Sequence, residues 1–568
     1  MNNRVRMAVL LGAAVVVLGL AMSAASAPDP ISRAEFSSSL LQLQAMASEG
    51  EFSGGAGQIS NPTCVTSTGS ADLSCDRLYD PDNEVTIAVD PENPNHLAAG
   101  SNDYVLLPKG ATLIARVPTG FFTSTNGGST WLDGQVPMGA GGGGGNGDPV
   151  VGFNAKYDLV HMTQLSAGCG QSGPWCGHIS ISVATSKDGG ETFDSPVTVA
   201  QGSGSLSPSA QGVFNDKPWM TVDNTPSSPT FGRVYVTYTQ FELAKLGYVR
   251  SPIMITWSDD GGRKWTKPFE ISGSSASLCE YQETGSASQC DEDQFSVPVV
   301  LRDGTVVVHF ANAQNETDWE ASQEFESQIL VVRSTDGGYT WSSPVKVAAL
   351  EDGTGTDYPV NVDGRATQTG YQFRTQTVQG MTADPVTDDL YVFWTDNSAG
   401  THDVGGTPVT QSQVYISKST DDGLTWSAPQ QITSTPSDNW MAWAAAYDGK
   451  VGVLYMSAAP PGGAYPGNRY VVNFRSSVNG GSTWSAPQQL NATPSYVNYS
   501  MWFRAGGAAD PKATFIGDYN GLVAAPAGGG AVAFHGVWTD MSRVATYAEL
   551  ARSGAPQDAY YAKQIVGS

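Results

Sequence analysis

The chain has 568 residues, of which 40% are hydrophobic and 15% charged, with 65 glycines and 33 prolines. This balance is typical of a turn-rich globular β protein and argues against a disordered chain, a coiled coil or a helical solenoid. The net charge of −25 argues against nucleic acid as a partner, because phosphate binding needs a basic surface.

The first 27 residues have the layout of an export signal. A basic start and an apolar run from Met7 to Met22 precede the small residues Ala25-Ser-Ala27. This pattern predicts a signal peptide over 1–27 and a secreted or otherwise extracytoplasmic mature chain, cell-surface attachment included. An uncleaved anchor is the alternative, although 16 apolar residues are short for a bilayer span of about 20. No later segment is apolar enough to span a membrane.

Residues 28–83 form an N-terminal extension before the repeats begin. Ser32-Arg-Ala-Glu35 reads as a capping box and predicts a short helix through Met46. A closing strand for the last repeat is conceivable here, but the sequence does not assign one.

The six cysteines fall into three pairs that are close in sequence. In an exported chain this spacing predicts three local disulfides, each fastening one loop. The predicted pairs are Cys64–Cys75, Cys169–Cys176 and Cys279–Cys290. The six histidines are scattered, so the sequence predicts no metal site and no cofactor.

One octet, Ser-x-Asp/Asn-x-Gly-x-x-aromatic, recurs six times. Each copy follows an alternating apolar strand, and most copies precede a Ser/Pro segment that leads into another strand. The polar side chains can bond turn amides, glycine supplies the positive φ, and the aromatic ring can pack on the sheet. We therefore expect six hairpin turns whose aromatic residues, such as Trp131 and Trp341, are structural. The copies begin at Ser124, Ser186, Ser258, Ser334, Ser419 and Ser477.

Upstream of every octet lies a second repeat, a strand, a turn and another strand. Val85–Asp90 followed by Leu97–Gly100 is one clear copy, and a seventh copy near Ile516 has no octet after it. Together the repeats give four antiparallel strands per unit, the blade of a β-propeller. The sequence predicts one all-β propeller over 84–568, with seven blades favoured and six as the alternative.

The octets resemble the Asp-box, or BNR repeat, of sialidase-like β-propellers of exported bacterial type. The likeness covers roughly residues 84 to 543 and extends to Phe515-Ile-Gly-Asp-Tyr-Asn-Gly521 and Val537-Trp-Thr-Asp540. Sialidases use a tyrosine nucleophile with a glutamate, an aspartate acid/base and three arginines that bind the substrate carboxylate. The resemblance thus implies an exo-sialidase type of glycoside hydrolase with a carbohydrate substrate.

Functional residues of a propeller are expected where the innermost strands open into the central channel. Capping of loops is the structural alternative for the acidic ones. The residues at these openings are Glu84, Asp148, Asp216, Lys217, Asp293, Gln294, Arg374, Asp438, Trp440, Asp518 and Tyr519. From this set, with Arg504 from a loop, the hypothesis takes Tyr519, Asp518, Asp148 and Asp216 as catalytic and Arg374, Arg504 and Trp440 as substrate-binding. Tyr519 is the nucleophile or a proton donor, Asp148 or Asp216 the acid/base, and Arg374 the carboxylate ligand.

Two departures from the sialidase pattern keep other functions open. The early Arg-Ile-Pro motif is missing, and only Arg374 lies at an inner-strand opening, so that Arg302, Arg365 and Arg504 would have to reach in from loops. A polysaccharide lyase on a seven-bladed propeller is one alternative. A non-catalytic propeller that binds glycans or a protein is the other. Oligomeric state cannot be inferred from the sequence.

Overall fold

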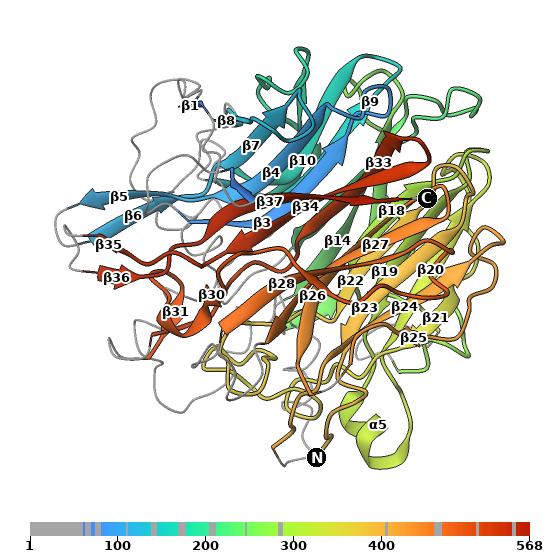
Figure 1. Cartoon of the computed structure of the whole chain (residues 1–568). Helices are drawn as coiled ribbons and strands as arrows, with labels where there is room; N and C mark the ends of the chain where they lie inside the picture. Colours follow the sequence, from blue (N-terminus) through green and yellow to red (C-terminus); the bar gives the residue numbers. More distant parts are fainter. Residues whose placement is uncertain are drawn as a thin grey trace.

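The computed structural model of the chain is a β-propeller of seven four-stranded antiparallel blades (Figure 1). The structure describes residues 61–62, 70–73, 81–109, 112–137, 145–168, 178–203, 212–244, 247–281, 288–403, 407–434, 436–458, 469–506, 511–547 and 552–567. The predicted fold class and the count of seven blades are confirmed. The predicted signal peptide and the helix through Met46 lie outside the described residues.

The blades follow one another along the chain, each built from the channel outwards. Blade 1 contains β3 (Asp82–Val89), β4 (Leu97–Asp103), β7 (Thr119–Ser124) and β8 (Leu132–Gln135). Blade 2 contains β9 (Gly145–Asn154), β10 (Leu159–Gly168), β11 (His178–Ser186) and β12 (Val197–Ala200). Blade 3 contains β13 (Gly212–Val222), β14 (Val234–Ala244), β16 (Ile253–Ser258) and β17 (Phe269–Glu270). Blade 4 contains β18 (Asp293–Val300), β19 (Val306–Asn312), β20 (Gln328–Ser334) and β21 (Val345–Ala349).

The last three blades keep the same order. Blade 5 contains β22 (Val378–Ala383), β23 (Leu390–Asp396), β24 (Gln413–Ser419) and β25 (Gln430–Gln431). Blade 6 contains β26 (Asn439–Tyr447), β27 (Lys450–Ala458), β28 (Arg469–Ser477) and β29 (Gln488–Gln489). Blade 7 contains β33 (Gly521–Gly528), β34 (Ala531–Asp540), β37 (Asp558–Val566) and, from the N-terminal extension, β2 (Ser70–Asp72).

Short elements decorate the blades. They are β1 (Asn61–Pro62) beside β8, β5 (Val105–Lys109) paired with β6 (Thr112–Arg116), β15 (Gly247–Arg250) beside β14, β30 (Ser495–Tyr496) beside β28, β31 (Arg504–Ala505) paired with β32 (Lys512–Ala513), β35 (Ala545–Tyr547) paired with β36 (Arg552–Gly554), the α-helix α5 (Glu316–Ser322) and the 3-10 helix η1 (Val497–Tyr499). No helix among the described residues is long and apolar enough to cross a membrane.

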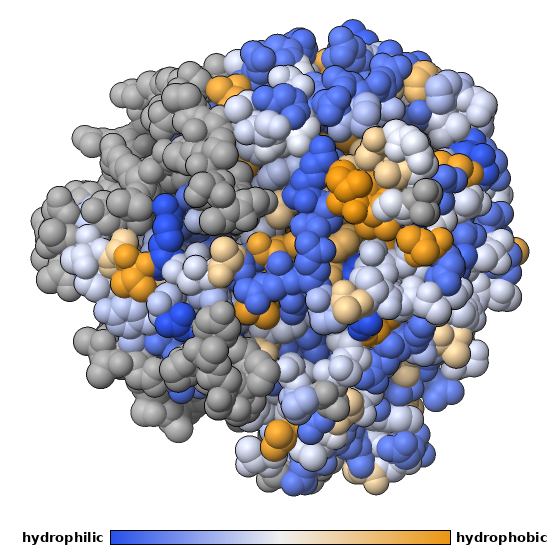
Figure 2. Space-filling view, in the orientation of Figure 1, coloured by the Kyte–Doolittle hydropathy of each residue, from blue (hydrophilic) through white to orange (hydrophobic). Residues whose placement is uncertain are grey.

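The seven innermost strands form a closed ring. Each one contacts the innermost strand of the next blade, and β33 of the last blade contacts β3 of the first. Apolar side chains from neighbouring blades pack between the sheets, as Val297, Met381, Trp443 and Leu522 do in one cluster that joins blades 4 to 7. Burial of these faces is what holds the blades together, since hydrophobic area is the main favourable contribution to folding. Outside, hydrophilic side chains cover most of the described surface on the face in Figure 2.

Blade 7 is closed by a strand from the other end of the chain. Ser70, Ala71 and Asp72 of β2 pair with β37 in the last blade. Arg543 fastens this junction, because its guanidinium lies 2.8 Å from carboxylate oxygens of both Asp72 and Asp558. The extension before residue 84 therefore supplies part of the propeller, an assignment that the sequence left open.

All six octets are turns between the third and fourth strands of a blade, as predicted. In the copy from Ser334 to Trp341, the Ser334 hydroxyl accepts a bond from Gly338 N at 2.8 Å, and Asp336 accepts one from Thr340 N at 2.9 Å. The Trp341 indole donates to Gly338 O at 2.9 Å, which closes the turn over its own backbone. Hydrogen bonds from Thr340 lower the pKa of Asp336 to about 2, so the box stays ionised and intact.

One of the three predicted disulfides is confirmed. Cys279 and Cys290 are bonded and both side chains are fully buried between blades 3 and 4. The other two predicted pairs lie outside the described residues.

Candidate functional site

The openings of the innermost strands carry a repeated backbone distortion. In blades 1 to 6 the pairing of the innermost strand with its neighbour shifts near its start, which is the mark of a β-bulge. Five of these bulges place a non-glycine residue in the left-handed region: Glu84 (φ 55°), Asp148 (φ 50°), Lys217 (φ 50°), Phe295 (φ 57°) and Met441 (φ 48°). That conformation costs about 1–2 kcal/mol per residue. Strain of this kind is concentrated at functional sites, where it re-aims side chains.

Three of the bulge residues meet in one buried ion cluster. The Lys217 ammonium lies 2.6 Å from Asp518 Oδ2, 3.2 Å from Glu84 Oε1 and 3.4 Å from Asp148 Oδ2. All four side chains are at least nine-tenths buried. Blades 1, 2 and 3 and the segment before β33 thus each contribute one charge to the same point.

Arg374 reaches this cluster from the long connection between β21 and β22. Its guanidinium donates two hydrogen bonds to the Asp518 carboxylate, from Nε at 2.7 Å and from NH2 at 2.6 Å. The backbone of Arg374 bonds to Thr514 O at 3.0 Å, and its guanidinium lies 4.4 Å from the centre of the Phe515 ring. The fork geometry fixes Arg374 in one orientation.

The buried charges shift one another's protonation. Burial and the adjacent Asp148 carboxylate raise the pKa of Glu84 well above its ordinary value, although Lys217 opposes them. Burial would also raise the pKa of Asp518, but Arg374 and Lys217 outweigh it and hold that pKa below its ordinary value. Burial first, and then the charge of Glu84, raise the pKa of Tyr519. These shifts favour the ionised form of Asp518, the neutral phenol of Tyr519 and the protonated form of Glu84.

Asn102 forms hydrogen bonds with both Glu84 and Asp148. Its side-chain amide donates to Glu84 Oε2 at 2.9 Å, and its carbonyl oxygen accepts from Asp148 N at 2.7 Å. Asn102 therefore fixes the Glu84 side chain relative to the strand opening that carries Asp148.

A pocket opens beside the cluster. One side is polar, formed by Asp148, Lys217 and Asp518, and the other is aromatic. The aromatic side consists of Trp219, Phe295, Trp443 and Tyr519. Trp219 and Trp443 stack with ring centres 4.7 Å apart and planes at 26°, while Trp219 meets Tyr519 edge-on at 5.4 Å. Charged groups on one wall and flat rings on the other suit the two faces of a sugar ring.

The structure brings five of the predicted site residues together. Asp148, Asp518 and Tyr519 line the pocket, and Arg374 pairs with Asp518. Asp216 is 7% exposed. Burial raises the pKa of Asp216, and the positive charges of Lys217 and Arg374 oppose that shift. Its carboxyl group therefore lies among the same charges.

Two of the predicted substrate-binding residues lie elsewhere. Trp440 is fully buried and packs against Phe373 and Tyr371, with ring centres 5.2 and 5.6 Å apart. Arg504 is in β31, where its guanidinium lies 3.4 Å from the backbone oxygens of Ser500 and Ser553. A bulge between Trp440 and Trp443 explains the first difference, because it turns Trp443 rather than Trp440 towards the pocket.

Three of the bulge residues at the site had no role in the sequence hypothesis. Glu84 and Lys217 were counted only as residues at strand openings, and Phe295 was not counted. A signal for them does exist, because Glu84, Asp148, Lys217 and Phe295 occupy the same position in successive copies of the strand repeat, just before the alternating apolar run. Repeat phase, rather than residue type, identifies the bulge.

Comparison with known proteins gives similarity in structure only. No family model matches the chain, and no curated protein matches it either. Among solved structures, an ulvan lyase from a new family of polysaccharide lyase is 10% identical with a TM-score of 0.41, and the match covers 86% of this chain and 94% of the lyase. A Hadza microbial sialidase is 12% identical with a TM-score of 0.38, over 89% of this chain and 96% of the sialidase. A leech intramolecular trans-sialidase is 12% identical with a TM-score of 0.40, over 69% and 67% of the two chains.

Proposed function

We propose that this chain is an extracytoplasmic, sialidase-like, glycan-active protein, a glycoside hydrolase of the exo-sialidase type that works in the pocket beside Lys217. One observation carries the proposal: the carboxyl groups of Asp148 and Asp518, the Tyr519 phenol and an aromatic wall converge on one pocket from different parts of the chain. The export-signal pattern and the buried disulfide support a location outside the cytoplasm.

The Glu84–Asp148 pair supplies the acid and the base. The raised pKa of Glu84 makes it the acid that protonates the leaving oxygen of the glycoside, and the Asp148 carboxylate at the pocket wall accepts the phenol proton of Tyr519. The pair therefore gives up one proton and takes one back in the same step. Tyr519 attacks the anomeric carbon as the nucleophile, and the Lys217 ammonium, 5.5 Å from the ring centre, stabilises the developing phenolate charge.

The remaining groups bind and orient the sugar. Trp219 and Trp443 offer a flat apolar surface for one ring face. Arg374 is the ligand for a substrate carboxylate, and such a substrate must compete with Asp518 for the same guanidinium fork. This competition makes Arg374 the residue that distinguishes a sialidase from a hydrolase of neutral glycans.

The test offers the purified chain aryl sialosides, neutral aryl glycosides and uronate polysaccharides in parallel. Release of the aryl alcohol from the sialoside is expected, with a loss of about 10²-fold or more in kcat/KM for Tyr519→Phe and Asp148→Asn. Arg374→Ala should weaken turnover of sialosides and leave that of neutral glycosides unchanged. Glu191→Gln, at an exposed position away from the pocket, is the matched control and should behave as the unmodified chain.

Other outcomes assign the other functions. An unsaturated product that absorbs in the ultraviolet identifies a lyase, and glycan binding without turnover identifies a binding module. If the unmodified chain and Tyr519→Phe are both folded and turn over the substrate equally, the reaction does not take place in this pocket.

A further inference from the structure

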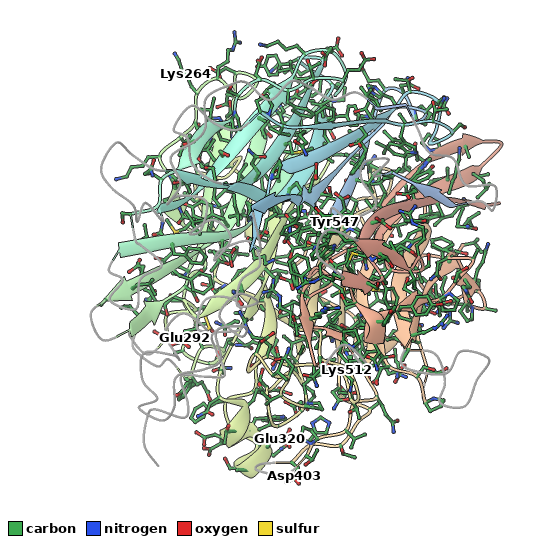
Figure 3. All side chains as sticks on the ribbon, turned by 90° about the vertical axis from the view of Figure 1, so that its left-hand side faces the viewer. Lys264, Glu292, Glu320, Asp403, Lys512 and Tyr547 are labelled. Atoms are coloured by element: carbon green, nitrogen blue, oxygen red, sulfur yellow. A yellow bond between two sulfur atoms is a disulfide. The ribbon has the colours of Figure 1, made fainter. Side chains whose placement is uncertain are left out.

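A second cluster of ionisable side chains lies at the edge of the molecule, around α5. Its members are Glu320 on α5, Glu351 just after β21, Asp357 in the following loop and His402 in the loop after β23. One ligand-type atom from each lies within 4.8 Å of every other. Figure 3 shows Glu320 on α5, with Asp403, the neighbour of His402, close by and both far from Tyr547.

The geometry converges on a single point. His402 Nδ1 lies 2.6 Å from Asp357 Oδ1, 3.3 Å from Glu320 Oε1 and 3.5 Å from Glu351 Oε2. Two ligands bound at about 2.0–2.3 Å to one ion can be at most roughly 4.6 Å apart. The four atoms are therefore close enough to surround one ion after small adjustments, in which His402 and Asp357 exchange their direct hydrogen bond for bonds to the ion.

Outer hydrogen bonds hold the carboxylates in this orientation. Asp357 Oδ2 accepts from Gly353 N at 2.5 Å, which leaves Oδ1 to point towards His402. Glu351 Oε1 accepts from the Trp319 indole at 3.3 Å, and Glu351 Oε2 faces His402 Nδ1 at 3.5 Å. Such outer partners are typical of metal sites, where they fix the direction of each ligand.

Negative charge exceeds positive charge around the cluster. His402 is within ion-pair distance of the carboxylates of Glu320, Glu351 and Asp357, so one imidazole faces three acids. Nearby, Glu316 at the start of α5 is 1% exposed and its Oε2 is buried without a hydrogen-bond partner, while the charges of Asp352 and Asp357 act on it. Among the described residues, no lysine or arginine forms an ion pair with these acids. A bound divalent ion would supply positive charge that one imidazole does not, since buried carboxylates are costly without it.

We propose that Glu320, Glu351, Asp357 and His402 bind one divalent metal ion, with Zn²⁺ as the ion that fits best. Three carboxylate oxygens and one imidazole nitrogen make a closed four-ligand set, as structural zinc sites have. The imidazole favours zinc over calcium, which prefers six to eight oxygen ligands.

The ion would fasten the connection that delivers Arg374 to the pocket. Residues 350–377 link β21 to β22, and both Glu351 and Asp357 lie near the start of this connection. Asp403 N bonds to Thr356 O at 3.0 Å, so the loop of His402 is already joined to it. Metal binding therefore ties α5, the β21–β22 connection and the His402 loop together at one point.

The experiment measures metal binding and melting temperature and requires no enzymatic activity. The full mature chain is freed of metal with a chelator, titrated with ZnCl₂ and, in separate runs, with MnCl₂ and CaCl₂, and followed by calorimetry and thermal melting. We expect one equivalent of Zn²⁺ to bind and to raise the melting temperature. His402→Ala and Glu351→Gln should each lower the zinc affinity by 100-fold or more.

Glu326→Gln is the matched control, because Glu326 pairs with Lys346 outside the cluster and its loss should leave zinc binding unchanged. Two substitutions in the cluster keep the test valid if one of them prevents folding, which circular dichroism would reveal. The absence of zinc binding by the unmodified chain, or unchanged affinity in both folded variants, overturns the site. Tighter binding of calcium than of zinc overturns the choice of ion.

Discussion

Lys217 is the residue whose removal tests the central ion cluster most directly. Its ammonium has carboxylate oxygens of Asp518, Glu84 and Asp148 within 3.4 Å, and its side chain is 7% exposed. In Lys217→Met the aliphatic part is preserved and the charge is lost. Breaking a buried ion pair by removing one partner costs about 3–5 kcal/mol, because the other charge stays buried without compensation.

The structure divides this cost among the three carboxylates. Asp518 keeps both hydrogen bonds from Arg374, and Glu84 already favours its protonated form, so neither is left as an isolated charge. Asp148 loses the one lysine or arginine that contacts it among the described residues. We therefore expect most of the 3–5 kcal/mol to come from Asp148. Neutralising Asp148 as well should recover about 0.5–3 kcal/mol of it, the range typical of residues in direct contact.

Equilibrium unfolding in guanidinium chloride measures these values for the unmodified chain, Lys217→Met, Asp148→Asn and the double variant. Lys187→Met is the matched control: Lys187 pairs with Asp194 on the surface, where the two side chains are 69% and 59% exposed, and its loss should cost less than about 1 kcal/mol. The description of the cluster is refuted if Lys217→Met costs no more than Lys187→Met. Additive effects of Lys217→Met and Asp148→Asn would refute their direct interaction.

Trp131→Ala should lower the free energy of unfolding by about 3–5 kcal/mol because the ring is 3% exposed, whereas Trp341→Ala should cost less because its ring is only half-buried; similar costs in chemical unfolding would contradict this ranking. Replacing Cys279 and Cys290 by serine should cost about 3 kcal/mol, the loop-closure value for a separation of 11 residues, and leave the circular dichroism of the propeller unchanged; peptide mapping that finds free thiols at these positions in the native chain would oppose it. Burial lowers the pKa of His309 to about 3, so below the unfolded value of about 6.5 the unfolded chain takes up a proton that the folded chain does not, and stability decreases as the pH is lowered. Between pH 7.5 and pH 4.5 the stability of His309→Phe relative to the unmodified chain should therefore rise by about 2.7 kcal/mol, and parallel pH profiles of the two would speak against a neutral buried histidine.

Local patterns in the sequence determine the architecture of this protein. An octet such as Ser334–Trp341 specifies its turn through bonds within eight residues, so it forms the same turn in each of the six blades that carry it. The strand repeat likewise predicts seven blades, because the alternation of apolar residues in each strand and the position of each copy can be read from the chain alone. For the same reason the repeat phase by itself predicts that Asp148 and Asp518 lie at strand openings towards the channel.

Contacts between distant segments were decided only by the tertiary structure. Lys217 and Glu84 are 133 residues apart, and Arg374 and Asp518 are 144 apart, so no local pattern relates the members of either pair. Trp443 rather than Trp440 lines the pocket because β26 has a bulge between them, and the packing of the whole ring of blades offsets the cost of that bulge. The strand β2 pairs with β37 only when the ends of the chain meet, and the cluster around His402 is assembled from three segments of neighbouring blades that no local pattern relates.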